Sequence, residues 1–460
     1  MSTVVIRGCE VVATMDGRGT ELAGGSIVID DGVIAWAGEG PAPERPGAEV
    51  VDGRGMVAVP GLVNTHHHLY QAITRTRAQD SGLFDWLREL YPVWGRLDAE
   101  WVHTAALVGI AELALSGCST VSDHHYVFPA GSPDLLKAEI DAAAALGVRF
   151  QPCRGSMDLG ESSGGLPPDH VVQDADAILA DTEDAVHHHH DPSPGSMVRV
   201  AVGPCSPFSA SPRLMRESAR LARKLGVTMH THIAETADEE RFCREQFAKR
   251  PLELLDDLEF LGETTWLAHC VHLDRADIAR IARTRTGVAW CPTSNLRLGS
   301  GVAPARELIE AGVRVGFAVD GSASNDGGDL LAESRMGMLV MRGAHGPAAM
   351  PAREALRIAT SGGARCLGRD DVGSIEVGKR GDVTLFEVDD LAHAGASDPV
   401  ASLVLCAPRG PRHLLVEGRA VVRDRRLVGI DQDDIARRGH ELARRIASSP
   451  AAARAKAAPR

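Results

Sequence analysis

Two histidines two residues apart, His66 and His68, close a short apolar segment in the run Pro60-Gly-Leu-Val-Asn-Thr-His-His-His-Leu-Tyr70. In a β-strand, residues i and i+2 share a face, so both imidazoles can bind one metal ion while His67 points to the opposite side. The pattern predicts a metal site, with surface or core histidines that bind nothing as the alternative.

Three further apolar segments end in residues that suit the same site. They are His230-Thr-His232-Ile-Ala-Glu235, Ala268-His269-Cys270 and Ala318-Val319-Asp320-Gly321. Imidazole nitrogens together with a carboxylate suit zinc or a similar divalent ion, and an open coordination position would hold a water molecule. We therefore expect a hydrolytic metal centre assembled from several strand ends.

The elements that must position these residues alternate along the chain. Eight apolar segments are predicted strands: Met56–Thr65, Ser119–His124, Val148–Cys153, Val198–Pro204, Val227–His232, Thr265–His269, Gly287–Cys291 and Val315–Asp320. Segments between them, such as Arg213–Leu225 and Ala276–Arg283, carry apolar residues at helical spacing. Eight such units predict a (β/α)8 TIM barrel, whose functional groups lie at the carboxyl ends of its strands.

The two ends of the chain show a different pattern. Residues 1–55 and 373–430 alternate apolar and polar residues between turns, as β-strands do. Neither segment is long enough for a stable core alone, so we expect both to form one composite β-sandwich. The predicted division is 1–58 and 369–460 for the β domain, including a terminal helix and a basic tail, and 59–368 for the barrel.

Composition narrows the functional classes. A net charge of −13 and a pI near 5.8 argue against nucleic-acid binding. The nine cysteines show no Cys-x-x-Cys pair, and no apolar run approaches the roughly 20 residues that cross a bilayer. We expect a cytoplasmic enzyme with a small-molecule substrate, no membrane role and a homo-oligomeric state.

These motifs resemble the amidohydrolase superfamily over nearly the whole chain, and the terminal β segments match the composite domain such enzymes pack beside the barrel. Within the superfamily the chain is similar to the branch of cytosine, guanine and S-adenosylhomocysteine deaminases, whose diagnostic element is the His-x-x-Glu of His232-Ile-Ala-Glu235. Four further segments resemble the group of 8-oxoguanine deaminases, often labelled hydroxydechloroatrazine ethylaminohydrolases. They are His67-His68-Leu-Tyr-Gln71, Leu83-Phe-Asp-Trp86, Asp123-His-His-Tyr126 and Gly160-Glu-Ser-Ser-Gly-Gly-Leu-Pro-Pro168.

The resemblance implies that His66, His68, His232 and Asp320 bind a single metal ion, while His269 faces the water or the substrate. Binuclear relatives need a carboxylated lysine at the end of the fourth strand. This chain has only five lysines, and its fourth strand ends Gly203-Pro-Cys-Ser-Pro207, without a lysine. One divalent ion per subunit is therefore expected, zinc first, with iron or manganese as alternatives.

The expected reaction is hydrolytic deamination of 8-oxoguanine to urate and ammonia. The metal would lower the pKa of its water from about 15.7 toward about 7. His269 and Asp320 would orient and deprotonate that water, and Glu235 would protonate the ring nitrogen and later pass a proton to ammonia. Alternatives are a triazine aminohydrolase, another purine, pterin or pyrimidine deaminase, and a metal-binding module without turnover.

Three residues are candidates for binding the heterocycle. Gln71 could hydrogen-bond its amide edge, Trp86 could stack on its ring and Arg154 could contact an oxo group. The alternatives are a loop-capping amide, an apolar helix-face residue and an ion-paired loop charge, respectively. The loop over Gly155–Pro168 is a candidate lid.

Several further histidines and cysteines are expected to have structural roles. The run His187–His190 is predicted to be a solvated helix end, His272 a helix-start residue, and His125 a wall residue of the pocket. The thiols of Cys205, Cys270 and Cys291 are expected to be buried hydrophobes, since covalent catalysis would need an activating base.

Overall fold

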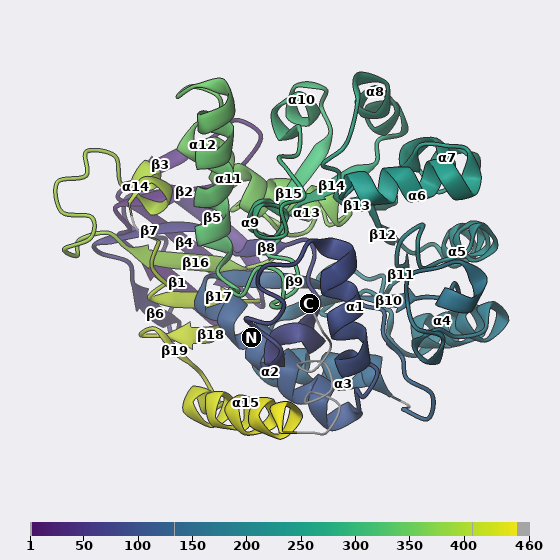
Figure 1. Cartoon of the computed structure of the whole chain (residues 1–460). Helices are drawn as coiled ribbons and strands as arrows, with labels where there is room; N and C mark the ends of the chain where they lie inside the picture. The colour runs from purple at the N-terminus through teal and green to yellow at the C-terminus, as the bar shows by residue number, and fades with distance from the viewer. Residues whose placement is uncertain (1, 133, 407, 449–460) are drawn as a thin grey trace.

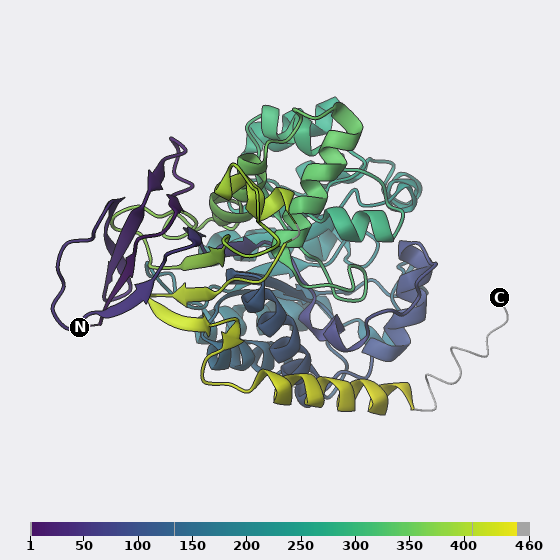
Figure 2. The same ribbon diagram turned by 90° about the vertical axis from the view of Figure 1, so that its left-hand side faces the viewer.

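A parallel barrel surrounded by helices forms the centre of the molecule, and a β domain packs at one side of it (Figure 1, Figure 2). The computed structural model describes residues 2–132, 134–406 and 408–448.

Eight strands form the barrel, and each is parallel to the next. They are β8 (Leu62–Asn64), β9 (Cys118–His125), β10 (Arg149–Ser156), β11 (Ala201–Pro204), β12 (Met229–Ile233), β13 (Thr265–His269), β14 (Gly287–Trp290) and β15 (Arg314–Phe317). The backbone N–H of Thr65 donates to the carbonyl oxygen of Phe317 (3.1 Å), and that of Asp320 donates to His66 (3.2 Å). Because these bonds join the first and last strands, the barrel closes, and the predicted fold is confirmed.

The helices that link the strands lie outside the barrel (Figure 1). They are α1 (Leu83–Trp94), α2 (Ala99–Leu115), α3 (Leu135–Leu146), α4 (Ala175–His189), α5 (Pro212–Leu225), α6 (Ala237–Phe247), α7 (Pro251–Asp257), α8 (Arg275–Thr284), α9 (Pro292–Arg297) and α10 (Ala305–Glu310), and α11 (Leu330–His345), α12 (Ala352–Arg357) and α13 (Gly363–Cys366) follow the last strand. Local sequence sets their ends: the side chain of Ser211 accepts from Leu214 N at the start of α5, and Gly226 ends it with a φ of 68°. The predicted helices over Arg213–Leu225 and Ala276–Arg283 correspond to α5 and α8.

The first predicted strand, Met56–Thr65, is in fact two strands that belong to different sheets. β7 (Met56–Pro60) pairs within the β domain, and β8 begins at Leu62 in the barrel. The chain changes sheets at Gly61, where a Cβ atom would lie 2.2 Å from the Ser119 hydroxyl oxygen. Only glycine allows this close approach of the two sheets.

The β domain consists of two sheets that share one apolar core. A four-stranded sheet contains β1 (Thr3–Arg7), β4 (Gly25–Asp30), β5 (Val33–Glu39) and β6 (Glu49–Asp52). A seven-stranded sheet contains β2 (Val11–Ala13), β3 (Glu21–Ala23), β7, β16 (Val383–Glu387), β17 (His413–Val416), β18 (Arg419–Arg423) and β19 (Arg426–Leu427). Strands from both ends of the chain thus meet in one sheet, as expected for a composite domain.

The C-terminal helix α15 (Gln432–Ala447) packs along the barrel helix α2 (Figure 2). Arg445 on α15 lies 3.0 Å from the carboxylate of Glu100 on α2. The basic tail expected over residues 451–460 lies outside the described residues. Among the helices that the structure does describe, none combines the length and hydrophobicity needed to cross a membrane.

Candidate active site

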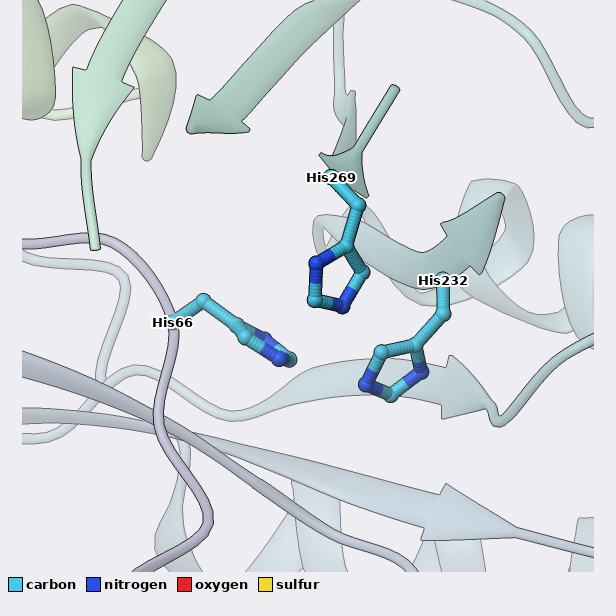
Figure 3. Close-up of side chains that lie close together, drawn as sticks. All are labelled: His66, His232 and His269. Atoms are coloured by element: carbon cyan, nitrogen blue, oxygen red, sulfur yellow. The ribbon is translucent and has the colours of Figure 1, made fainter. Parts of the chain in front are cut away.

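Five predicted site residues converge at the carboxyl ends of the barrel strands. His66 and His68 follow β8, His232 lies in β12, His269 ends β13 and Asp320 follows β15. All five are buried, with at most 7% of any of them exposed. In Figure 3, His66, His232 and His269 point toward one another from three separate segments.

The donor atoms of this cluster lie at distances that suit one metal ion. The Nε2 atoms of His66 and His68 lie 3.3 and 3.4 Å from Oδ1 of Asp320. Nε2 of His68 lies 3.1 Å from Nε2 of His232. Ligands bound at about 2.0–2.2 Å in a tetrahedron are separated by about 3.3–3.6 Å. These four side chains could therefore hold a single divalent ion.

Hydrogen bonds on the outer side of each imidazole direct its other nitrogen inward. Nδ1 of His68 and Nδ1 of His232 each lie 2.7 Å from a backbone carbonyl oxygen, of His124 and Cys205 respectively. A carbonyl only accepts, so both Nδ1 atoms carry a proton and both Nε2 atoms keep a free lone pair. Burial lowers the pKa of His68 and of His232 to about 4, which keeps these rings neutral and able to bind a metal.

Asp320 is held with one carboxylate oxygen toward the cluster. Its Oδ2 accepts hydrogen bonds from the hydroxyls of Ser294 (2.5 Å) and Ser324 (3.0 Å). Both hydroxyls donate to the carboxylate, which stabilises its ionised form. Asp320 is thus an anion at the centre of the site.

Two buried atoms of the cluster lack a hydrogen-bond partner among the residues that the structure describes. They are Nε2 of His66 and Oδ1 of Asp320, which face each other across 3.3 Å. Unpaired buried polar atoms are costly, and a lone pair facing a carboxylate oxygen is repulsive. A cation between them would remove both costs, so the residues present fit a bound metal.

Glu235 lies at the rim of the cluster as a buried acid. Its Oε2 lies 3.5 Å from Nε2 of His269, and its Oε1 lies 3.5 Å from the hydroxyl of Ser300. Burial, followed by the nearby carboxylates of Asp320 and Glu239, raises the pKa of Glu235 well above its usual value. A carboxyl group with a raised pKa can carry a proton at neutral pH and donate it to a substrate.

The backbone that carries these groups is unusual. His269 and Asp320 have φ values of 71° and 62°, and Ala234 beside Glu235 has 52°. Non-glycine residues rarely adopt this left-handed conformation, and where they do the surroundings must stabilise it. Both carboxylate oxygens of Glu239 accept backbone N–H groups here, from Ala234 (2.9 Å) and Glu235 (2.8 Å). Glu239 therefore fixes the turn that presents Glu235.

A cavity opens above the cluster. Its polar end includes His68, His232, Glu235, His269, Asp320 and Ser324. Its remaining wall is largely apolar and comprises Leu83, Trp86, Leu87, Tyr91, Tyr126, Cys205, Phe208 and Leu298. A cavity with an apolar, aromatic wall at one side and a metal-binding end at the other suits a small planar heterocycle.

The three predicted substrate-binding residues lie in different places. Trp86 lines the cavity, and its indole N–H donates to the carbonyl of Ala323 (3.0 Å). Gln71 is buried behind it, where its Oε1 accepts from Ala323 N (3.4 Å) and its Nε2 lies 3.5 Å from the Tyr70 hydroxyl. Gln71 therefore supports the loop after Asp320 and does not belong to the lining residues.

The structure does not bring Arg154 into this cavity. Its guanidinium stacks on the Phe128 ring at 3.7 Å, and its nitrogens donate to Asp181 (2.6 Å), Gln173 (2.9 Å) and the carbonyl of Gly155. These partners occupy the N–H donors along the edge of the Arg154 guanidinium group. Arg154 is thus an ion-paired charge, the alternative to a substrate contact, because α4 supplies its counter-ion.

Other histidines occupy structural positions. His125 lies between Glu139 Oε1 (2.8 Å) and the carbonyl of Val127 (3.0 Å) behind the site. His272 precedes α8, and its Nε2 bonds to the carbonyl of Ser300 (3.0 Å). The run His187–His190 forms the last turn and the C-cap of α4, as predicted for a helix end.

The loop over Gly155–Pro168 is partly packed against the rest of the barrel. Leu166 is buried, and its N–H donates to the carbonyl of Phe208 (3.0 Å). The carboxylate of Asp158 accepts from both N and Oγ of Ser211 at 2.6 Å. The lid role stays a prediction.

Sequence reasoning missed several residues of the site. Tyr91, Phe208 and Leu298 line the cavity, and Asn295 lies 3.0 Å from Nδ1 of His269. Tyr91 could have been found, because Leu83, Leu87 and Tyr91 repeat every four residues on the face of one helix, α1 (Leu83–Trp94). Asn295 carries no such signal, since only the fold brings it to His269.

Comparison with known proteins shows a family likeness over most of the chain. The model of the amidohydrolase family matches residues 57–421. An 8-oxoguanine deaminase of Pseudomonas aeruginosa is 43% identical and covers 91% of this chain and 94% of its own length. A hydroxydechloroatrazine ethylaminohydrolase of Pseudomonas sp. strain ADP is 38% identical, covering 97% and 96%.

A solved structure shares the whole architecture. It is the atrazine chlorohydrolase TrzN of Arthrobacter aurescens TC1 complexed with zinc, which has a TM-score of 0.92, 34% identity and coverage of 96% of this chain and 100% of that one. The chain belongs to the amidohydrolase family and is an aminohydrolase of its deaminase branch.

Proposed function

We propose that this enzyme hydrolyses the exocyclic C–N bond of free 8-oxoguanine, giving urate and ammonia. The observation that carries the proposal is the pairing of Glu235, a buried acid with a raised pKa, with a four-donor cluster in the same cavity. The 43% identical relative supports the choice of 8-oxoguanine over other heterocycles.

The proposed metal ligands are His66, His68, His232 and Asp320, and one zinc ion per subunit is the proposed cofactor, with iron and manganese as alternatives. Such an ion would act as a Lewis acid that lowers the pKa of water toward neutrality. The inward lone pairs of the imidazoles and the anionic Oδ1 of Asp320 support this assignment.

The remaining steps belong to the protein's own side chains. Asp320 and His269 orient the attacking water and accept its proton, since both face the space beside Glu235. Glu235 donates a proton to the ring nitrogen next to the amine-bearing carbon, so that negative charge does not accumulate as the C–O bond forms. The proton taken from water then passes from Asp320 or His269 to Glu235, which delivers it to the departing nitrogen as the C–N bond breaks and ammonia leaves. The hydroxyl proton of the adduct returns to Glu235 as the carbonyl forms.

The heterocycle would lie between the apolar walls of the cavity. Trp86 presents an aromatic ring to it, with its indole N–H already bonded to Ala323, so the ring is fixed before the substrate arrives. We propose that Gln71 acts indirectly, by holding the loop after Asp320. Fixed walls favour a rigid planar substrate over a flexible one.

A second candidate is the hydrolysis of an amino-substituted triazine by the same mechanism. The 38% identical ethylaminohydrolase and the solved chlorohydrolase support it, because both relatives are named for triazine substrates. The two candidates share the cluster and Glu235, so they differ only in what the cavity wall accepts.

The deciding experiment measures ammonia or amine release by zinc-loaded protein from 8-oxoguanine, guanine, isocytosine, cytosine, S-adenosylhomocysteine and hydroxylated triazines. Highest kcat/KM for 8-oxoguanine is the expected result. Turnover of a triazine without turnover of any purine would overturn the substrate and keep the mechanism. No turnover of any compound by protein that contains one equivalent of zinc would support a binding module instead.

A further inference from the structure

All three tyrosines of this chain lie beside the active-site cavity. Tyr70 and Tyr91 are fully buried and Tyr126 is 4% exposed. Tyr91 and Tyr126 line the cavity, while Tyr70 lies behind Tyr126, with 5.8 Å between the ring centroids. A phenol hydroxyl in such a place needs a partner, so each one either stabilises the wall or is available to a ligand.

The other two tyrosines lie beside the proposed metal ligands. Nε2 of Gln71 lies 3.5 Å from the Tyr70 hydroxyl, and the rings of Tyr70 and Tyr126 pack edge to face with 5.8 Å between their centroids. The ring of Tyr126 packs edge-on against His68 at 5.0 Å. These two residues therefore belong to the support of the proposed metal ligand His68.

The Tyr91 hydroxyl has a much weaker partner. Within the described residues its one hydrogen-bond contact is the sulfur of Met157, at 3.7 Å. A thioether is a poor acceptor, so this contact satisfies little of the donor capacity of a phenol. Burial raises the pKa of Tyr91 well above its usual value, which keeps the hydroxyl protonated and able to donate.

Tyr91 is also held rigidly. It lies on α1, whose residues Leu83, Trp86 and Leu87 form the same wall of the cavity. Two indole N–H groups tie this helix to the barrel loops: Trp86 bonds to Ala323 and Trp94 bonds to the Thr74 hydroxyl at 3.2 Å. A donor on a fixed helix can discriminate between substrates, because it cannot turn away to another partner.

We infer that the Tyr91 hydroxyl is a second recognition point, which donates a hydrogen bond to a carbonyl oxygen at the end of the substrate remote from its amine. In 8-oxoguanine the amine and the carbonyl of the five-membered ring lie at opposite ends of a rigid plane. With the amine-bearing carbon beside Glu235, the five-membered ring extends toward the apolar wall that α1 supplies. The inference rests on the proposed function and names the group that selects the 8-oxo substituent.

The test compares the unmodified enzyme with Tyr91→Phe on two substrates. Isocytosine has the amine-bearing ring of 8-oxoguanine but lacks the five-membered ring and its carbonyl. Loss of one neutral hydrogen bond should raise KM for 8-oxoguanine about tenfold, with kcat and the KM for isocytosine changed by less than about twofold. Met157→Leu is the matched control, since it removes the sulfur and keeps the phenol, and it should leave both KM values within about twofold.

A binding measurement makes the result independent of turnover. In the Glu235→Gln background, titration calorimetry should show an about tenfold higher Kd for 8-oxoguanine when Tyr91→Phe is added. Equal KM and Kd values with and without the hydroxyl, in protein of unchanged zinc content and Tm, would overturn the role of Tyr91 alone. Failure of the unmodified enzyme to deaminate 8-oxoguanine would overturn the proposed function and this recognition point with it.

Discussion

Nδ1 of His66 lies 2.7 Å from Nε2 of His230, and Nδ1 of His230 lies 2.8 Å from the carbonyl oxygen of Trp266. The carbonyl requires a proton on Nδ1 of His230, so Nε2 of His230 is an acceptor and Nδ1 of His66 must donate to it. The Nε2 atom of His66 is then left as a lone pair directed at Asp320. A chain of three groups thus fixes the tautomer of a proposed metal ligand.

His230→Ala should weaken zinc binding about 10- to 100-fold, because nothing would then orient His66 or fix its proton. Competition with a chromophoric chelator measures the affinity. His230→Gln should restore part of it, since an amide can accept from His66 and donate to Trp266. His188→Ala, on the exposed end of α4, is the control, and an affinity that His230→Ala leaves unchanged would contradict this account.

Glu235→Gln should lower kcat by about 10³-fold while the zinc content stays the same. Glutamine keeps the size of the side chain and its contact with Ser300, but it cannot deliver the proton that the ring nitrogen needs. Metal analysis and steady-state kinetics on the same preparation separate the two effects. Loss of zinc in this variant, or residual kcat within about tenfold, would argue against Glu235 as the proton donor.

The barrel was predictable because its strands are short apolar runs that alternate with segments of helical spacing, and the runs corresponding to β8, β12, β13 and β15 lead into the polar site residues. Thr265–His269 was predicted with the bounds that β13 has. The division of Met56–Thr65 at Gly61 was missed, although Pro60-Gly61 is a dipeptide that often marks a turn, because the residues on both sides of it are apolar and buried. Which sheet each half joins depends on partners that are distant in the sequence.

The candidate site, too, could be predicted in one part and not in the other. The metal-binding cluster could be predicted, since a strand's end fixes where its side chains gather. The substrate wall could be predicted only in part. Trp86 lines the cavity and Tyr91 shares its helix, whereas nothing in the local sequence of Arg154 shows which residues the fold places beside it. Arg154 meets Asp181, an anion from α4, whereas Tyr91 meets a sulfur and stays available.

Trp86→Ala should therefore change substrate binding, whereas Arg154→Ala should change the stability of the fold. Trp86→Ala should raise KM about tenfold or more, since it removes an aromatic wall of the cavity. Arg154→Ala should lower the free energy of unfolding by about 1–3 kcal/mol and leave KM within about twofold, because its partners lie outside the cavity and Asp181 is largely solvated. Urea unfolding and steady-state kinetics on both variants give the comparison, and a large KM effect with unchanged stability in Arg154→Ala would reverse the assignment.

Behind the site, Glu139 is a buried acid that should make stability depend on pH. Its Oε1 lies 2.8 Å from Nδ1 of His125, and burial raises its pKa from 4.5 to about 8. An acid whose folded pKa is raised favours folding while it stays protonated, and that contribution is lost as the pH rises toward about 8. Burial lowers the pKa of His125 from 6.5 to about 4, so this histidine reduces the stability of the fold only when the pH falls below about 6.5.

Between about pH 7 and about pH 9 the effect of Glu139 is therefore largely separated from that of His125. The Tm of the unmodified enzyme should fall over this range by several degrees more than the Tm of Glu139→Gln, which has no carboxyl group to ionise at this position. Asp141→Asn, on the exposed face of the same helix, should follow the unmodified enzyme. Parallel Tm curves for Glu139→Gln and the unmodified enzyme would show that Glu139 does not change its protonation state in this range, and would contradict a folded pKa of about 8.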